Sequence, residues 1–272
     1  MNNDPSLRLA SPRLVLVALT RNGALRARQL ASRMPRATVM VAGKFRATMD
    51  DLTNRVEAYR GPLRGRIAGL FARYDGIVFF LSLGAVVRMI APHLTSKYRD
   101  PAVVAVDDAG QFVIPVVSGH VGGANELARE LARWLGATAV VTTASDVNET
   151  LSVDILGREL GWRVEASKTT LTRVSAQVVN GEPIAFVREA GSRDWWPTDM
   201  PLPGNIRLFE RMEDVPLDRF GAVLWVTHRA VDESLARQLS GRLVVYRPSL
   251  TQKFGLCPPA RQKCPKKRSL LE

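Results

Sequence analysis

A glycine-rich segment near the middle of the chain carries the residues best suited to chemistry. It reads Ser118-Gly119-His120-Val121-Gly122-Gly123-Ala124-Asn125 and lies between an apolar run and a helical pattern. Glycines allow a backbone to approach a ligand closely, and unpaired N–H groups at the start of a helix attract anions. The segment therefore suits a carboxylate, a phosphate or a developing oxyanion, although a tight structural turn would also account for its glycines. Its spacing is not the G-x-G-x-x-G of dinucleotide-binding loops.

His120 is the candidate general acid or base of this segment, because imidazole can take or give a proton near neutral pH. A structural hydrogen-bonding role is the alternative for a lone histidine. The other histidines, His93 and His228, do not form a metal-ligand spacing with it, so we predict no protein-bound metal and no cofactor. Ser118 lies outside a G-x-S-x-G elbow, which argues against a serine hydrolase of that type.

Two further polar clusters follow apolar runs. One runs from Gly84 to Arg88 and continues to Lys97, and the other is Thr142-Thr143-Ala144-Ser145-Asp146. Arg88 and Lys97 could hold carboxylates, or they could be solvated surface charges. The residues of the second cluster could bind a ligand or cap the next helix. Because open α/β sheets bind ligands at the carboxyl ends of their strands, we expect all three clusters to line one cleft at one edge of a sheet.

The elements that would position these clusters alternate along the first half of the chain. Apolar runs predict strands over 13–19, 37–41, 77–81, 102–106, 112–117 and 138–141, and helical spacing predicts helices over 24–33, 63–73, 83–94 and 122–135. The Asp-rich turn 107–110 lies between two β-branched runs and predicts a hairpin. We therefore predict an α/β fold with a mixed, mostly parallel, Rossmann-like sheet flanked by helices.

The second half predicts a smaller α/β unit. Helices are expected over 152–161, 170–180 and 233–239, strands over 184–187, 206–209, 222–226 and 243–246, and a loop over 191–204. We predict an N-terminal domain over 1–147, a middle domain over 148–248 and a basic, disordered tail over 249–272. Cys257 and Cys264 lie in that tail, and their C-x6-C spacing is a poor zinc signal.

The chain carries 38 Lys and Arg against 26 Asp and Glu, a net charge of +12. Such a charge suits an anionic partner, either nucleic acid or a small polycarboxylate, although a high isoelectric point alone has many causes. The fingerprints of RRM, KH and zinc-finger modules are absent, so we predict no nucleic-acid partner. No apolar run approaches the roughly 20 residues that span a bilayer, and Met1–Ala10 lacks an apolar signal segment. We therefore expect no membrane association and a cytoplasmic location.

Three segments together resemble the CbiG family of cobalamin biosynthesis proteins in order and spacing. They are Gly84–Leu94 with Lys97 and Asp100–Asp107, then Ser118–Leu127, then Val141–Asp146. The resemblance covers about residues 75–160, and the flanks agree in element order. It implies a cobalt-precorrin-5A hydrolase of anaerobic cobalamin biosynthesis, which opens the δ-lactone of its substrate and releases acetaldehyde to give cobalt-precorrin-5B. Cobalt would arrive with the substrate, whose carboxylates suit the basic charge.

On this basis we predict that His120 activates water, that the glycine loop binds a carboxylate or the lactone oxyanion, and that Arg88 and Lys97 anchor carboxylates. The predicted substrate-binding set is Arg88, Lys97, Ser118, Gly119, Gly122, Gly123, Asn125, Thr142, Thr143 and Asp146.

Members of this family usually continue into a C-terminal domain after an Arg-Pro pair, which is Arg247-Pro248 here. Because a basic tail follows instead, we expect that domain to be absent from this chain. The alternative function is therefore a non-catalytic cobalt-precorrin-binding subunit that needs a separate C-terminal domain. That domain or neighbouring pathway enzymes are the expected protein partners. An unrelated nucleic-acid binder is a third hypothesis.

Overall fold

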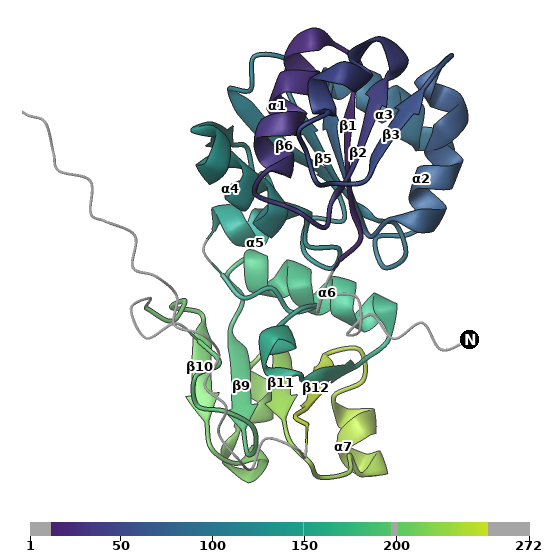
Figure 1. Ribbon diagram of the computed structural model, residues 1–272. Helices are drawn as coiled ribbons and strands as arrows, with labels where there is room; N and C mark the ends of the chain where they lie inside the picture. Colours follow the sequence, from purple (N-terminus) through teal and green to yellow (C-terminus); the bar gives the residue numbers. More distant parts are fainter. Residues whose placement is uncertain (1–11, 149, 197–200, 250–272) are drawn as a thin grey trace, which may run out of the picture.

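The computed structural model describes residues 12–148, 150–196 and 201–249, and these form two sheets with helices packed on both (Figure 1). The first sheet has seven strands in the order β3-β2-β1-β4-β5-β6-β7, and the second has five in the order β10-β9-β11-β12-β8. The predicted fold class, a mixed and mostly parallel α/β sheet followed by a smaller α/β unit, is confirmed.

The first sheet forms from the apolar runs of the first half of the chain. Its strands are β1 (Leu14–Ala18), β2 (Thr38–Ala42), β3 (Val56–Tyr59), β4 (Gly76–Phe80), β5 (Ala102–Val106), β6 (Phe112–Val117) and β7 (Thr138–Ala139). Its helices are α1 (Arg21–Ala31), α2 (Ile67–Arg73), α3 (Leu83–Ile90), α4 (Ala124–Leu135) and α5 (Ala144–Val147).

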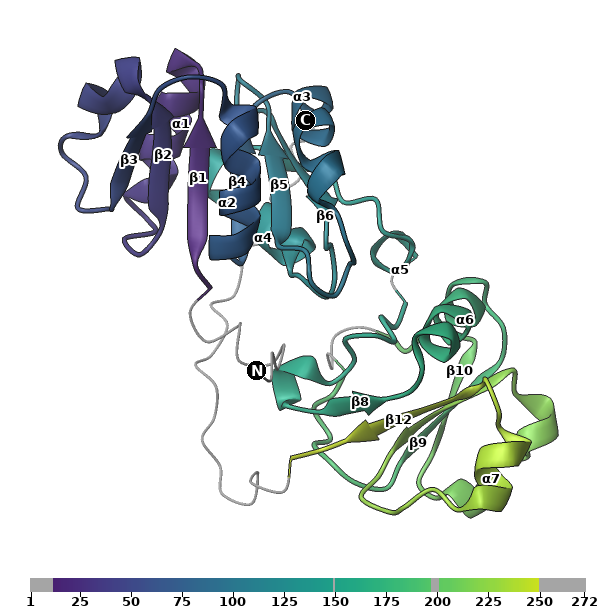
Figure 2. The ribbon, with the colours of Figure 1, turned by 90° about the vertical axis from the view of Figure 1, so that its right-hand side faces the viewer.

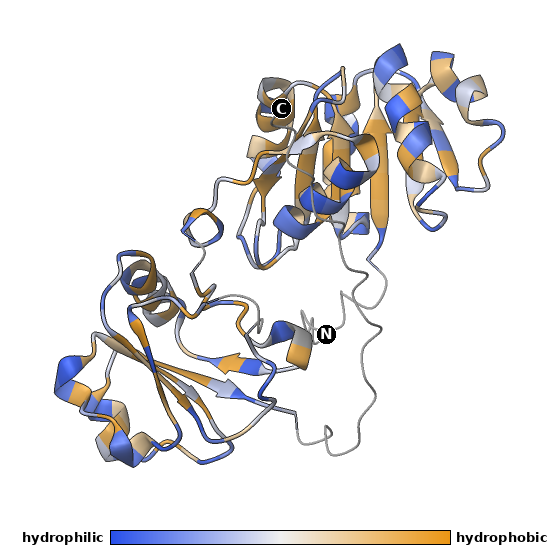
Figure 3. Ribbon diagram, turned by 90° about the vertical axis from the view of Figure 1, so that its left-hand side faces the viewer, coloured by the Kyte–Doolittle hydropathy of each residue, from blue (hydrophilic) through white to orange (hydrophobic). Residues whose placement is uncertain are grey.

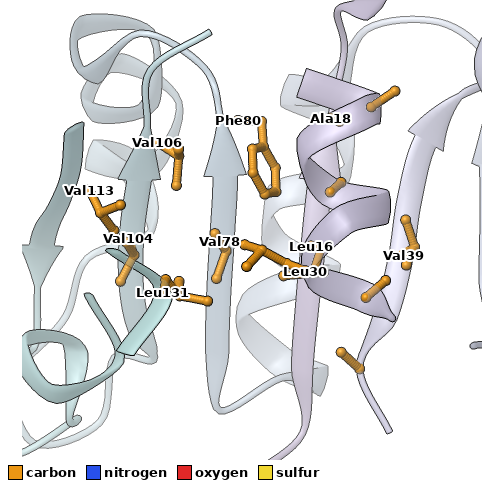
Figure 4. Close-up of a cluster of buried hydrophobic side chains, with 14 of the residues drawn as sticks. Leu16, Ala18, Leu30, Val39, Val78, Phe80, Val104, Val106, Val113 and Leu131 are labelled. Atoms are coloured by element: carbon orange, nitrogen blue, oxygen red, sulfur yellow. The ribbon is translucent and has the colours of Figure 1, made fainter. Parts of the chain in front are cut away.

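Alternate side chains of the strands fill two cores, one on each face of this sheet. On one face, Leu30 of α1 and Leu131 of α4 pack against Leu16, Val78 and Val104 (Figure 4). On the other face, α2 and α3 cover the residues of β1 and β4 that point the opposite way. Burial on both faces explains why the central strands are continuous apolar runs, while the helices turn their polar residues outward (Figure 3).

The direction of β6 decides where polar clusters can meet. The strands β1 to β5 are all parallel, whereas β6 runs antiparallel to β5, and β7 is parallel to β6. The carboxyl ends of β6 and β7 therefore lie at the edge where the other five strands begin. The segments that follow β6 and β7 also lie toward the second sheet (Figure 2).

The second sheet is built from the remaining strands and two helices. Its strands are β8 (Arg163–Glu165), β9 (Ile184–Arg188), β10 (Ile206–Phe209), β11 (Ala222–Val226) and β12 (Leu243–Arg247), and its helices are α6 (Lys168–Val179) and α7 (Glu233–Gln238). Strands β9 to β12 are parallel, and β8 is antiparallel to β12. The chain passes from the first sheet to the second between β7 and β8. We call residues 12–148 the first unit and the described residues from 150 onward the second unit. The exact domain limits stay a prediction.

Three sequence-based expectations differ from the structure in the first unit. The helix expected over 24–33 begins earlier, at Arg21, because the Thr20 hydroxyl accepts from the Gly23 N–H at 2.9 Å and caps the helix. The helices expected over 63–73 and 83–94 each contain a 3₁₀ segment, Leu63–Arg66 before α2 and Ala91–His93 after α3. The strand β3 was not predicted, since Val56-Glu57-Ala58-Tyr59 mixes charge with apolar residues at the sheet edge.

The helix expected over 152–161 is wrong. This segment consists of turns and a 3₁₀ stretch, Arg158–Leu160. Gly157 and Gly161 both adopt positive φ, and a Cβ at Gly157 would lie 2.1 Å from the Trp162 ring. These left-handed residues interrupt the helical backbone, and the segment extends toward the first unit instead. The short strand β8 that follows was also not predicted.

Within the described ranges, every helix is too short or too polar to cross a membrane. The predicted disordered tail, with Cys257 and Cys264, lies outside these ranges from residue 250 onward.

Candidate active site between the two sheets

The glycine loop, residues 118–123, connects β6 to α4 at the edge facing the second unit. Ser118 has φ 59° and Gly123 has φ 81°, so the chain turns sharply at both ends of the loop. The N–H groups of Ala124 and Asn125 return to the carbonyls of Ser118 and Gly119, at 3.2 and 3.0 Å. Within the described residues, the backbone N–H groups of 119–122 donate no hydrogen bond. They form the unpaired donor set that an anion requires.

Two glycines of the loop are fixed by close packing. A Cβ at Gly119 would lie 2.7 Å from Oδ1 of Asn125, and a Cβ at Gly122 would lie 2.4 Å from Cβ of Ser118. Both distances are shorter than real Cβ contacts. The tightness of the turn therefore accounts for these glycines without a bound ligand.

Asp146, at the start of α5, is the centre of a hydrogen-bonded network. Its carboxylate accepts from Thr143, from Arg129 and from Nδ2 of Asn125, the last at 2.9 Å. Asn125 also donates to the Thr143 hydroxyl at 2.8 Å. Burial raises the pKa of Asp146, but the hydrogen bonds from Thr143, Arg129 and His120 outweigh burial and hold that pKa at about 2. Asp146 is therefore ionised at neutral pH.

His120 lies between two carboxylates from different units. Its Nε2 is 2.6 Å from Oδ2 of Asp146 and 3.1 Å from the hydroxyl of Ser145. Its Nδ1 is 3.8 Å from Oδ1 of Asp154, which is beyond hydrogen-bonding distance. The short contact assigns a hydrogen to Nε2, as in sites where a carboxylate orients a catalytic imidazole. The His120 side chain is 19% exposed, so it can be reached from the cleft.

The segment 150–158 of the second unit completes this site. Asp154 binds Nζ of Lys97 at 3.1 Å, and Arg158 donates to the His120 carbonyl at 3.2 Å. Burial lowers the pKa of Lys97, but the charge and hydrogen bond of Asp154 outweigh it and raise that pKa. Burial also lowers the pKa of Arg158, and the charge of Asp154 offsets this only in part. Tyr246, fully buried in β12, anchors the segment by donating to the carbonyl of Val153 at 2.7 Å.

A cleft of about 840 Å³ opens beside His120. Its volume lies within the range of roughly 300–1,000 Å³ that is usual for cofactor-sized ligands. From the first unit it is lined by Gly119, His120, Gly123, Asn125, Glu126, Arg129 and Asp146, and from the second unit by Thr150–Ser152, Ile155–Arg158, Leu160, Gly161 and Asp194–Trp196. One wall is polar and the other is largely apolar.

The structure brings together most of the residues predicted from the sequence. His120, Asn125, Thr143 and Asp146 share one network, and Gly119 and Gly123 also line the cleft. Four predicted residues have other surroundings: Lys97 binds Asp154, Ser118 donates to the carbonyl of Asp100 at 3.0 Å, Gly122 packs against Ser118, and Thr142 is exposed outside the cleft. Their proposed contacts with substrate stay predictions.

The expectation that three clusters share one edge is wrong for Arg88. This residue is exposed on α3, which begins at the carboxyl end of β4. Because β6 is antiparallel, the glycine loop lies at the opposite edge from the start of α3. Lys97 reaches the glycine-loop edge because the chain returns there to begin β5.

Sequence reasoning missed several residues of the site. Arg129 was not predicted as a site residue, and it binds Asp146. Its position four residues after Asn125, on the same face of α4, was a usable signal. Asp154, Arg158 and the Trp195-Trp196 pair had no local signal, because each acquires its role through long-range contacts.

Comparison with known proteins gives both units a family match. Residues 66–146 match the family described as cobalamin synthesis G N-terminal, and residues 151–248 match the cobalamin biosynthesis central region. A cobalt-precorrin-5A hydrolase from Priestia megaterium is 42% identical over 235 residues, covering 86% of this chain and 62% of that protein. One from Salmonella typhimurium is 33% identical over 187 residues, covering 69% of this chain and 49% of that protein.

A solved structure of a cobalamin biosynthesis protein G homologue from Sulfolobus solfataricus aligns with a TM-score of 0.47 and 19% identity, covering 87% of this chain and 60% of that one. The present chain thus spans less than two thirds of the length of each of these relatives.

Proposed function

Because the chain belongs to the CbiG family of cobalamin biosynthesis proteins through its N-terminal and central regions, we propose that it is a cobalt-precorrin-5A hydrolase. The reaction would open the δ-lactone and release acetaldehyde, giving cobalt-precorrin-5B. The observation that carries the proposal is His120, held between Asp146 and Asp154 beside a cleft that both matched regions line.

His120 acts as the general base in this proposal. The imidazole takes a proton from a water molecule, whose oxygen bonds to the lactone carbonyl carbon. The ring C–O bond then breaks, and the departing alcohol oxygen takes the proton back from the imidazole. Acetaldehyde leaves when this hydroxyl loses its proton and the C–C bond joining its carbon to the macrocycle breaks, with the bonding electrons passing into the conjugated ring. Asp146 is ionised at neutral pH, so it orients the ring and stabilises the imidazolium that forms between these two transfers.

The glycine loop and the arginines of the cleft are suited to bind the negatively charged groups of the substrate. The free N–H groups of 119–122 suit the oxyanion that develops on the lactone carbonyl, or a side-chain carboxylate of the substrate. Arg129 and Arg158 both line the cleft and are suited to bind the acetate and propionate groups of a cobalt-precorrin. Cobalt belongs to the substrate here, and we propose that the protein uses no metal or cofactor of its own. We also propose a cytoplasmic location and no nucleic-acid partner.

The test is anaerobic incubation of the purified chain with cobalt-precorrin-5A, followed by assay of acetaldehyde and product mass. We expect acetaldehyde from the wild type and a rate lower by about 10²–10⁴-fold in His120→Ala. His228→Ala is the matched control, because His228 is exposed in the second unit and outside the cleft.

Unchanged acetaldehyde release by His120→Ala would remove the general-base role. If the wild type binds the substrate without releasing acetaldehyde, and release appears when a separate C-terminal domain of the family is added, the chain is a binding subunit. Absence of release in both conditions would reject the hydrolase proposal for this chain.

A further inference from the structure

Two adjacent tryptophans of the second unit line the same cleft as His120. Trp195 and Trp196 lie in the crossover between β9 and β10 and are half-buried. The Trp195 ring stacks on Phe186 of β9, with ring centroids 4.0 Å apart and planes 19° from parallel. Trp196 is tilted by 47° against Trp195 at 6.0 Å. Because Phe186 is fully buried in the second sheet, the Trp195 ring rests on a rigid support.

These tryptophans differ from others in the same unit. Trp162 belongs to the same hydrophobic cluster but is 6% exposed, and Trp225 is 1% exposed on the other face of the sheet. Neither lines the cleft, whereas Trp195 and Trp196 both do. Packing of the core accounts for the buried pair. The same explanation leaves open why two large aromatic side chains border a cleft that water could fill.

The rest of the cleft indicates the chemistry of its occupant. Leu151, Ile155 and Leu156 extend the apolar wall beside the tryptophans. Two arginines add positive charge, Arg129 on the wall of the first unit and Arg158 on the wall of the second, and the glycine loop adds its free N–H groups. Aromatic faces bind flat π systems, and guanidinium groups bind carboxylates. A conjugated ring with carboxylates on its rim matches both walls at once.

We infer that Trp195 and Trp196 are the platform on which the conjugated macrocycle of the substrate lies, with its carboxylates turned toward Arg129 and Arg158. This inference rests on the proposed function and assigns a different role to each matched region. The central region recognises the ring, and the N-terminal region carries the groups that react. Ring recognition is independent of side-chain charge, whereas the arginines distinguish carboxylates from amides.

The experiment measures equilibrium binding of two stable corrins to the full chain by dialysis and absorbance. Cobyrinic acid carries free side-chain carboxylates, and cobinamide has the same ring with amides. The double variant Trp195→Leu/Trp196→Leu should bind both corrins about tenfold or more weakly, since stacking on an aromatic residue typically contributes that much. Trp195→Phe/Trp196→Phe should recover most of the binding, because phenylalanine keeps an aromatic face.

Trp162→Phe is the matched control for loss of a tryptophan from the same cluster, and it should bind both corrins within about twofold of the wild type. Thermal unfolding of each variant checks that the fold is intact. Wild-type affinity in the leucine variant, or no binding of either corrin by the wild type, would overturn the platform. Binding that depends on the tryptophans without any acetaldehyde release would leave the platform standing and reject the hydrolase.

Discussion

The two units contribute to the cleft in different ways. The first unit holds His120, Asn125, Thr143 and Asp146 in a network whose members bond to one another, so their geometry is set inside one unit. The second unit supplies Asp154, Arg158 and two tryptophans from the segments before β8 and β10, and Asp154 and Arg158 contact Lys97 and His120 of the first unit. In the proposed reaction we therefore expect proton transfer to depend mainly on the first unit, and recognition of the ligand to depend on how the second unit is held.

Replacing one carboxylate from each unit tests this division most strongly. We expect Asp146→Asn to lower the turnover number about 100-fold or more, because the amide no longer accepts all the bonds that orient His120. Asp154→Asn should lower it only about tenfold, which corresponds to ~1.4 kcal/mol, since Nδ1 of His120 lies 3.8 Å away. Steady-state kinetics of acetaldehyde release measures both. Equal losses would show that the two units share the chemistry.

The glycine loop should tolerate no added methyl group, in contrast to a glycine elsewhere in the same unit. Gly122→Ala is expected to lower the free energy of unfolding by about 1–3 kcal/mol, because its Cβ would overlap Ser118. Gly69→Ala in α2 is the control. Nothing lies within 4 Å of that Cβ, so the change should raise the free energy of unfolding by about 0.5–1 kcal/mol. Chemical denaturation compares the two, and a harmless Gly122→Ala would contradict the tight-turn interpretation.

Acid should weaken the first unit through Asp146. The pKa of this carboxyl is lower in the folded protein, about 2, than its ordinary value of 3.8. Its stabilisation is therefore fully present above pH 3.8 and is lost as the pH falls toward 2, a change of about 2 kcal/mol in the free energy of unfolding. Denaturation at pH 5 and pH 2.5 should show a smaller difference in Asp146→Asn than in the wild type. The same difference in both proteins would exclude Asp146 as its source.

The anchor of the second unit should have the smallest effect. Tyr246→Phe removes the hydroxyl that binds the Val153 carbonyl and should lower the free energy of unfolding by about 1 kcal/mol. Because Val153 precedes Asp154, the variant should also raise KM more than it lowers kcat. A change in kcat alone would contradict a positioning role.

Much of this architecture follows from local patterns. The buried strands are continuous apolar runs, and the glycine loop with His120 stands out by composition. Strands β3 and β8 were not predicted, because they lack a continuous apolar run. Tyr59 is the only buried residue of β3, and β8, Arg163-Val164-Glu165, has no buried residue. Asp154 and Trp195 were not predicted either, since their roles arise from contacts between segments far apart in the chain.

The misplacement of Arg88 has a different cause. The hairpin over β5 and β6 was predicted correctly, and a hairpin reverses the chain. The segment after β6 must then lie at the edge opposite the segment after β4. The predicted hairpin thus already separates Arg88 from the glycine loop, because the carboxyl end of an antiparallel strand lies at the edge where its neighbours begin.

The reversal at β6 also has a practical consequence. The cleft is built at one edge of the first sheet, and the carboxyl ends of β1, β2, β4 and β5 end at the other. Arg88 is exposed at that far edge, so Arg88→Cys would provide an attachment point there. A fluorophore or a surface tether attached at this position should leave the cleft open to substrate. The fold thus offers an attachment site at the edge of the first sheet that lies away from the proposed active site.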